Sequence, residues 1–162
     1  MIKVNVLINN KNWKKYIKDP KIYVKRNIKK LEQKINLFKI NTFTFSLLLS
    51  DNKNIQKLNK EFKNKNLPTD VLSFPFQEKK LLKKLLKKKS DIYLGDIIIS
   101  LNKIMPKKNK NNFKHAFDKI WIHGLSHLLG YRHKSDRDYL KMRKFENNIF
   151  KAVSSNDRKN TK

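Results

Sequence analysis

Three of the four histidines lie within eleven residues, in the stretch HGLSHLLGYRH. They are His123, His127 and His133. On a helix, side chains four residues apart share one face, so the first two imidazoles can bind the same ion. Gly130 is a residue type that ends helices, and it lets the chain turn back and bring in the third imidazole. The spacing H-x-x-x-H-x-x-G-x-x-H therefore predicts a three-histidine metal site, whereas His115 falls slightly off this face and is expected on the surface.

The ligand type favours one Zn²⁺ ion as the cofactor. Three neutral imidazoles at about 2.0–2.1 Å suit zinc and leave a fourth position for water or substrate. Nickel, copper and manganese also accept imidazole, so the ligands alone do not separate these metals. The chain contains no cysteine, which excludes thiolate ligands and disulfides.

The residue after the first histidine decides between two kinds of chemistry. Zinc peptidases with the pattern H-E-x-x-H-x-x-G-x-x-H place their general base there, but this chain has Gly124. A glycine inside a helix costs about 1 kcal/mol relative to alanine and usually marks a close approach by a backbone or a ligand. A peptidase mechanism is therefore disfavoured unless another carboxylate replaces the base. A metal can still polarise a phosphoryl oxygen, which points toward phosphodiester cleavage.

The composition supports a nucleic-acid partner. Forty Lys and Arg against thirteen Asp and Glu give a net charge of +27, and the pI is near 10.3. Such a field attracts polyanions. Lysine is strongly favoured over arginine, and asparagine and isoleucine are abundant, which is the bias that an A/T-rich genome would produce without any function for the charge. The charge supports an RNA interpretation without establishing it.

A second stretch, LNKEFKNKNLPTDVLSFPF at residues 58–76, is typical of a helix, a turn and a strand, with Lys63 and Lys65 near the turn. Thr69 and Asp70 are expected to hydrogen-bond the loop backbone. Together with HGLSHLLGYRH and LGDI, this stretch resembles the YbeY family of bacterial endoribonucleases, also called the rRNA maturation factor family. Its signature is H-G-x-L-H-L-x-G-Y-D-H, preceded by segments like N-x-x-F-R-x-x-D-x-P-T-D-V-L-S-F-P and L-G-D-I. The resemblance covers residues 1 to about 153.

The resemblance implies an α+β fold, a small mixed β-sheet packed by helices with a zincin-like metal-binding helix and turn. It implies a zinc-dependent, single-strand-specific endoribonuclease acting in 16S rRNA 3′-end maturation and ribosome quality control. The implied partners are single-stranded rRNA, the small ribosomal subunit and assembly factors, with no membrane or DNA partner. The ligands carry over to His123, His127 and His133. The family's arginine falls on Lys63, which the resemblance places at the active-site cleft, assisting catalysis or RNA binding.

Three departures from the family pattern bear on the site. Ser126 replaces leucine, which weakens helix packing slightly without touching the metal. Arg132 replaces an aspartate, so a carboxylate that could orient an imidazole is lost and a cation is placed near the site. Lys63 replaces arginine and keeps the charge without the bidentate fork. Arg132 and Lys65 are candidate phosphate or RNA contacts.

Two other functions stay open beside the nuclease. One is a non-catalytic RNA or ribosome-assembly binding module with a structural metal, and the other is a metallopeptidase. For the nuclease, the attacking group is either water or the substrate 2′-hydroxyl, and the sequence does not choose between them.

Hydrophobic periodicity predicts the elements that position these residues. Strands are expected at residues 2–8, 42–49, 71–76 and 93–100, with the third stopped or pushed to an edge by Pro75 and the fourth buried. Helices are expected after the caps Asp19, Asp51 and Ser135, and over residues 113–129. The lysine–leucine segment at 79–89 fits either a basic amphipathic helix or an extended arm. We favour a solvated insertion there over an RNA-contacting arm or a membrane-surface helix.

The chain length favours a single endoribonuclease-like domain at 1–153, followed by a polar, disordered tail at 154–162. No apolar run is long enough for a membrane span, and the start, MIKVNVLINN, lacks the apolar core of a signal peptide. The absence of cysteine suits a reducing compartment. We therefore expect a cytoplasmic protein.

Overall fold

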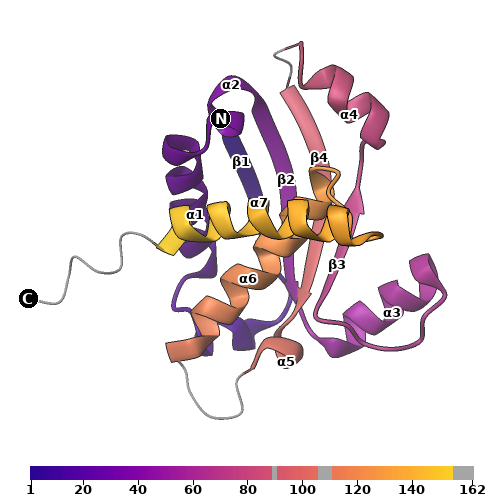
Figure 1. Cartoon of the computed structure of the whole chain (residues 1–162). Coiled ribbons are helices and arrows are strands. Elements are labelled where there is room, and N and C mark those ends of the chain that lie inside the picture. Colours follow the sequence, from indigo (N-terminus) through magenta and orange to yellow (C-terminus); the bar gives the residue numbers. More distant parts are fainter. Residues whose placement is uncertain (89–90, 106–110, 155–162) are drawn as a thin grey trace, which may run out of the picture.

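A computed structural model describes residues 1–88, 91–105 and 111–154, which form a four-stranded sheet with helices on both faces (Figure 1). The strands are β1 (Ile2–Ile8), β2 (Thr42–Ser50), β3 (Val71–Pro75) and β4 (Asp91–Ser100). Their order in the sheet is β1-β2-β4-β3, with β1, β2 and β4 parallel and β3 antiparallel at the edge. The predicted α+β fold with a small mixed sheet is confirmed.

The strand sequences explain this arrangement. In the centre of the sheet, Ile97, Ile98 and Ile99 of β4 are all buried, because consecutive side chains point to opposite faces and both faces are covered. Pro75 is the last residue of β3, where a proline costs little because this strand lies at the edge. The predictions of a buried fourth strand and an edge third strand are both confirmed.

Four of the helices follow the predicted signals: α1 (Pro20–Lys34), α3 (Asn52–Lys63), α6 (Asn111–Leu128) and α7 (Asp136–Ser154). The side chains of Asp19 and Asp51 accept hydrogen bonds from the first-turn amides of α1 and α3, as expected of caps. Ser135 accepts one from the amide of Asp138 at 3.2 Å and so caps α7.

Three short elements were not predicted: a 3₁₀ helix (Lys11–Lys15), α2 (Asn36–Ile40) and α5 (Leu101–Ile104). Each is too short to show a hydrophobic period. The 3₁₀ helix buries Trp13 completely, and its indole N–H donates to the carbonyl of Ser50 at 2.9 Å. Helix α1 ends where Ile35 adopts an extended backbone.

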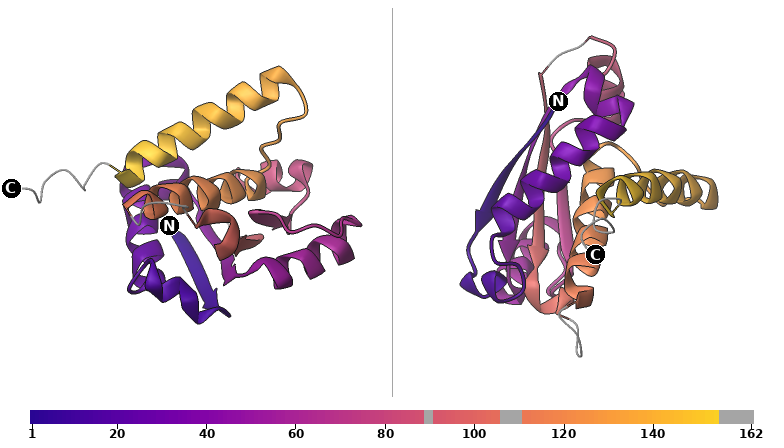
Figure 2. Two further views of the ribbon diagram at one scale, coloured as in Figure 1. Left: turned by 90° about the horizontal axis from the view of Figure 1, so that it is seen from below. Right: turned by 90° about the vertical axis from the view of Figure 1, so that its left-hand side faces the viewer.

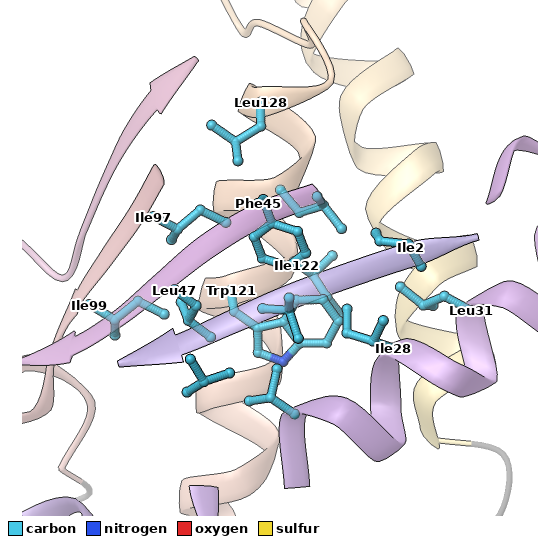
Figure 3. Packing of buried hydrophobic residues seen from close by; sticks show 14 of the residues in the cluster. Ile2, Ile28, Leu31, Phe45, Leu47, Ile97, Ile99, Trp121, Ile122 and Leu128 are labelled. Carbon is cyan, nitrogen blue, oxygen red and sulfur yellow. The ribbon is translucent and has the colours of Figure 1, made fainter. Parts of the chain in front are cut away.

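The main core lies between the sheet and the two helices α1 and α6. Figure 3 shows side chains from β1, β2 and β4 interlocking with the large ring of Trp121 and with residues of α1. Helix α7 lies over α6 on the side away from the sheet and also contacts α1 (Figure 2). Helix α3 packs on the opposite face through a smaller cluster of Ile55, Leu72 and Ile98.

One carboxylate is buried in the main layer. Asp118 of α6 is 6% exposed and accepts hydrogen bonds from the side chains of Tyr23, Asn27 and Trp121. Burial raises the pKa of Asp118 to about 6, although these three donors and the charge of Lys30 oppose the rise. This network ties α1 to α6.

The lysine–leucine segment forms a helix, α4 (Lys79–Leu85), which agrees with the helical alternative. Leu82 is 2% exposed and belongs to the main core, and Leu86 packs against it. The interpretation of this segment as a solvated insertion is therefore wrong for its leucine face. Lys80, Lys83 and Lys84 remain exposed to solvent.

Two predictions fall partly outside the described residues. The basic stretch PKKNKNN at 106–112 has a composition typical of a loop; residues 106–110 of it lie outside the described residues, and Asn111 begins α6. Of the tail predicted at 154–162, residues 155–162 likewise lie outside the described residues, and Ser154 is the last residue of α7. Within the described ranges, none of the helices combines the length and the apolar character needed to cross a bilayer.

Candidate metal centre and its cleft

The three histidines of the motif converge on one point at the end of α6. His123 and His127 project from the same face of the helix, and Gly130 takes a φ of +86° that turns the chain back toward them. His133 arrives from the turn before α7. One ligand nitrogen from each of the three imidazoles lies within 4.8 Å of the other two. The structure thus brings together the three residues that the spacing predicted.

The outer nitrogens of the first two imidazoles have acceptor partners. Nδ1 of His123 lies 2.8 Å from a carboxylate oxygen of Glu146, and Nδ1 of His127 lies 3.1 Å from the carbonyl oxygen of Tyr131. Because both partner oxygens are acceptors, each Nδ1 carries the proton and donates it. In the neutral rings, both Nε2 atoms then present lone pairs toward the same place.

This donor set fits a divalent metal ion such as zinc. The two Nε2 atoms are 3.1 Å apart, and two nitrogens bound at 2.0–2.1 Å to a tetrahedral ion lie about 3.4 Å apart. Burial, followed by the neighbouring His123, lowers the pKa of His127 to about 4, so His127 is neutral at physiological pH. Neutral imidazoles with converging lone pairs are what a metal requires.

Glu146 is a site residue that the motifs did not reveal. It comes from the middle of α7, and its side chain is 25% exposed beside that of His123 at 37%. Apart from Asp136 and Asp138 in the first turn, it is the only acidic residue in the sequence of α7, and this isolation was the available signal. The family pattern has an aspartate where this chain has Arg132, so we expected no carboxylate to orient a ligand imidazole. Glu146 supplies such a carboxylate from α7.

Arg132 lies at the carbonyl end of α6. One guanidinium nitrogen donates to the carbonyl oxygens of His127 and Tyr131, each at 3.0 Å. A cation in this position complements the negative end of the helix dipole. The Tyr131 carbonyl therefore accepts from both Arg132 and the His127 imidazole, so this arginine also helps to hold the loop that orients a ligand.

The histidines open into a cleft of about 380 Å³. Its walls come from α3 and the edge strand β3 on one side, and from the end of α6 and the α6–α7 turn on the other. The lining residues are Lys63, Val71, Ser73, Pro75, His123, His127, Arg132 and His133.

Lys63 and Lys65 differ in their places relative to this cleft. Lys63 is the last residue of α3, which ends because Asn64 adopts a left-handed conformation with a φ of 54°. Lys63 lines the cleft, whereas Lys65 is exposed and is not among its lining residues. In the loop that follows, an oxygen of Asp70 accepts from the amide of Val71, as predicted for Asp70. The Thr69 hydroxyl donates to the Asp70 side chain, whereas a backbone partner was predicted for it.

Gly124 allows α6 to lie unusually close to the sheet. A methyl group at this position would stand 2.8 Å from Cγ2 of Ile97 and 3.2 Å from the hydroxyl oxygen of Ser73. The expected close approach is thus real, and its partners are strand side chains. There is no room for a glutamate pointing from this position into the strands. Ser73 Oγ is itself buried and has no hydrogen-bond partner among the described residues.

Ser126, the other departure inside the motif, is fully buried. Its hydroxyl donates to the carbonyl oxygen of Ile122, one turn earlier, at 2.9 Å. The polar group is therefore satisfied within the helix.

Comparison with known proteins places this arrangement in a family. The family model described as endoribonuclease YbeY matches residues 7–154, a range that contains the histidines and both walls of the cleft. The chain belongs to the endoribonuclease YbeY family.

Relatives in the YbeY family align over nearly the whole chain. The endoribonuclease YbeY of Pelagibacter ubique is 45% identical over 159 residues, which cover 96% of this chain and 98% of the relative. The endoribonuclease YbeY of Ehrlichia ruminantium is 38% identical and covers 83% of this chain and 79% of its own length. The solution structure of TM1509 from Thermotoga maritima shares the fold, with a TM-score of 0.59 at 24% identity over 94% of this chain and 89% of that one.

Proposed function

We propose that this chain is a single-strand-specific, zinc-dependent endoribonuclease that acts in 16S rRNA 3′-end maturation and in ribosome quality control. Membership of the endoribonuclease YbeY family supports cleavage of RNA, and the convergence of three imidazoles supports a bound metal. The proposed site consists of His123, His127 and His133 as metal ligands and Lys63 as the catalytic cation. Its proposed partners are single-stranded rRNA, the small ribosomal subunit and assembly factors in the cytoplasm.

The observation that carries the proposal is the cleft that joins the histidines to Lys63. When bound, a zinc ion supplies a Lewis acid that withdraws charge from a phosphoryl oxygen and acidifies water. Phosphodiester cleavage concentrates negative charge on the oxygens of the transferring phosphoryl group. A cation fixed across the cleft stabilises that charge more in the transition state than in the bound substrate.

The chain's own residues divide this work. The Lys63 ammonium binds a non-bridging phosphate oxygen as a point charge and needs no bidentate geometry. One guanidinium nitrogen of Arg132 donates to the carbonyls of His127 and Tyr131. The other nitrogens of the guanidinium bind the phosphate backbone of the RNA. Glu146 and the Tyr131 carbonyl keep the ligand imidazoles in the neutral tautomer that binds metal.

The contact of Gly124 with Ile97 weighs against the metallopeptidase. A general base next to the first ligand is the residue that peptidases of this spacing use, and this chain has strand side chains where that base would project. No other carboxylate lines the cleft within the described part of the chain.

The first experiment pairs the wild-type protein with His127→Ala, purified side by side, on a labelled single-stranded RNA that carries the 16S 3′-terminal sequence. We expect cleavage by the wild type, its loss after chelation, its return with added zinc, and no cleavage by the variant. Equal cleavage by both proteins would indicate a contaminating nuclease. RNA binding without cleavage would support the non-catalytic binding module.

The second experiment compares Lys63→Ala with Lys65→Ala, which removes the same charge two residues away and outside the cleft. Loss of a group that stabilises transition-state charge lowers kcat by about 100-fold or more. We expect this for Lys63→Ala with little change in RNA affinity, and less than about a threefold effect for Lys65→Ala. The product ends then identify the attacking group: a 2′,3′-cyclic phosphate indicates the substrate hydroxyl, and a 5′-phosphate indicates water.

A further inference from the structure

A second cleft lies against the first ligand histidine. It has a volume of about 350 Å³ and is formed between α6 and α7. The residues that matter here are Lys119 and His123 from α6, and Tyr139, Arg143, Asn147 and Phe150 from α7. We call it the α6–α7 cleft. His123 lines both this cleft and the one that contains Lys63, so the two clefts meet at the proposed metal site.

The α6–α7 cleft combines aromatic rings with cations. The Arg143 guanidinium carbon lies 5.9 Å from the centre of the Tyr139 ring, and one guanidinium nitrogen donates to the Tyr139 hydroxyl at 3.3 Å. The Lys119 ammonium lies 6.0 Å from the centre of the Phe150 ring. Within the described residues, neither cation forms an ion pair with a carboxylate.

Most of this face of α7 lies outside the core, although Phe150 is half-buried and packs against the core's edge. Tyr139, Arg143 and Phe150 are spaced at four and seven residues and share one face, whereas Met142 and Ile149 of α7 are buried on another. Tyr139 is 48% exposed. An exposed aromatic residue beside unpaired cations is the combination with which proteins bind single-stranded nucleic acid, because any base can stack on the ring while the cations attract the backbone.

We propose that the α6–α7 cleft binds one nucleotide of a single-stranded RNA, next to the phosphate positioned at the three histidines. This inference rests on the proposed function. The base stacks on Tyr139, the amide of Asn147 hydrogen-bonds a base edge, and Arg143 and Lys119 face the backbone. A base in a duplex cannot reach the ring without leaving its stack, so this subsite provides a physical reason for a preference for single strands.

Glu146, the one carboxylate among the described residues that line the α6–α7 cleft, is compatible with this orientation of the nucleotide. Glu146 is engaged by the His123 imidazole at 2.8 Å, and its other oxygen is an acceptor. A hydrogen-bond donor of the nucleotide, such as a ribose hydroxyl or a base N–H, therefore faces Glu146. The phosphates lie toward the cations on either side.

The test measures KM and kcat of the zinc-loaded, full-length protein on a labelled single-stranded RNA carrying the 16S 3′-terminal sequence. The variants are Arg143→Ala, Tyr139→Ala and Tyr139→Phe. The matched controls are Lys144→Ala, which removes the neighbouring charge on α7, and Leu140→Ala, which removes the neighbouring exposed apolar side chain. Zinc affinity is measured for each protein to show that the metal site is intact.

We expect Arg143→Ala and Tyr139→Ala each to raise KM by about five- to tenfold, the range that loss of one stacking or backbone contact produces, with kcat retained. Tyr139→Phe keeps the ring and should stay within about twofold of the wild type, as should both controls. If the wild type cleaves RNA but Arg143→Ala and Tyr139→Ala behave like their controls, this inference is overturned and the proposed nuclease stands. A wild type that binds RNA without cutting it overturns the proposed nuclease, and the same variants compared by RNA affinity still decide the subsite. A wild type that neither cuts nor binds RNA overturns both.

Discussion

Replacing Glu146 with glutamine should weaken zinc binding about tenfold. The glutamate accepts the Nδ1–H of His123 at 2.8 Å, and glutamine keeps an acceptor in that place but removes the charge. Hydrogen bonds to charged groups contribute about 1.5–3 kcal/mol, against about 0.5–1.5 kcal/mol for neutral ones. The side chains of Glu146 and His123 are 25% and 37% exposed, so water screens the pair and the difference falls near 1.4 kcal/mol, which is about tenfold in affinity.

A graded series makes the comparison sharper. Glu146→Ala also removes the acceptor and should cost about 10- to 100-fold, the range seen when residues that hold metal ligands are removed. Glu61→Gln on α3 makes the same charge change at an exposed residue far from the histidines in the sequence and should leave zinc affinity unchanged. Affinity is measured by competition with a chromophoric chelator at neutral pH, and the unfolding temperature of each metal-free protein confirms the fold. Equal zinc affinity for Glu146→Gln and Glu61→Gln would refute the role assigned to this carboxylate.

Three further predictions concern stability. Gly124→Ala should lower the free energy of unfolding by about 1–2 kcal/mol, because overpacking against Ile97 outweighs the gain in helix propensity, and a raised unfolding temperature would contradict this. Since burial raises the pKa of Asp118 to about 6, the folded chain holds that proton more tightly than the unfolded chain. About 3 kcal/mol of stability is therefore lost as the pH rises from about 4 to above 6. Denaturant unfolding across this range should show the loss in the wild type and a flatter profile in Asp118→Asn. Zinc at about 100 times its Kd should stabilise the metal-free wild type by about 2.7 kcal/mol, and His127→Ala should show no such shift by calorimetry.

The parts of the site that follow from local geometry could be predicted from the sequence. The pairing of His123 with His127 depends on the helical repeat, and the turn at Gly130 depends on a residue that tolerates positive φ. The place of Lys63 came from the resemblance, since nothing local in NKEFKNKN distinguishes it from Lys65. The two lysines differ only in the folded chain, where α3 and β3 lie beside the end of α6 and Lys63 lines the cleft while Lys65 does not.

The parts that depend on packing between distant segments could not be predicted. Glu146 meets His123 because α7 returns across α6, and a sequence pattern contains no signal for that crossing. Trp13 fills the core from a single 3₁₀ turn too short for any period. The segment that forms α4 was interpreted as a solvated insertion because lysines surround its leucines. Leu82 is nevertheless buried, because the segment packs against the core.

The small cluster of Ile55, Leu72 and Ile98 has a consequence for how the cleft moves. Lys63 belongs to a helix anchored by this cluster, whereas the histidines belong to a helix anchored in the main core. Units with few buried apolar contacts open at lower free energy, so the backbone amides of α3 should exchange with deuterium faster than those of α6. We therefore expect the two halves of the cleft to fluctuate as separate cooperative units. A ligand that bridges the two halves removes that freedom when it binds. Its presence should slow deuterium exchange in α3 far more than in α6.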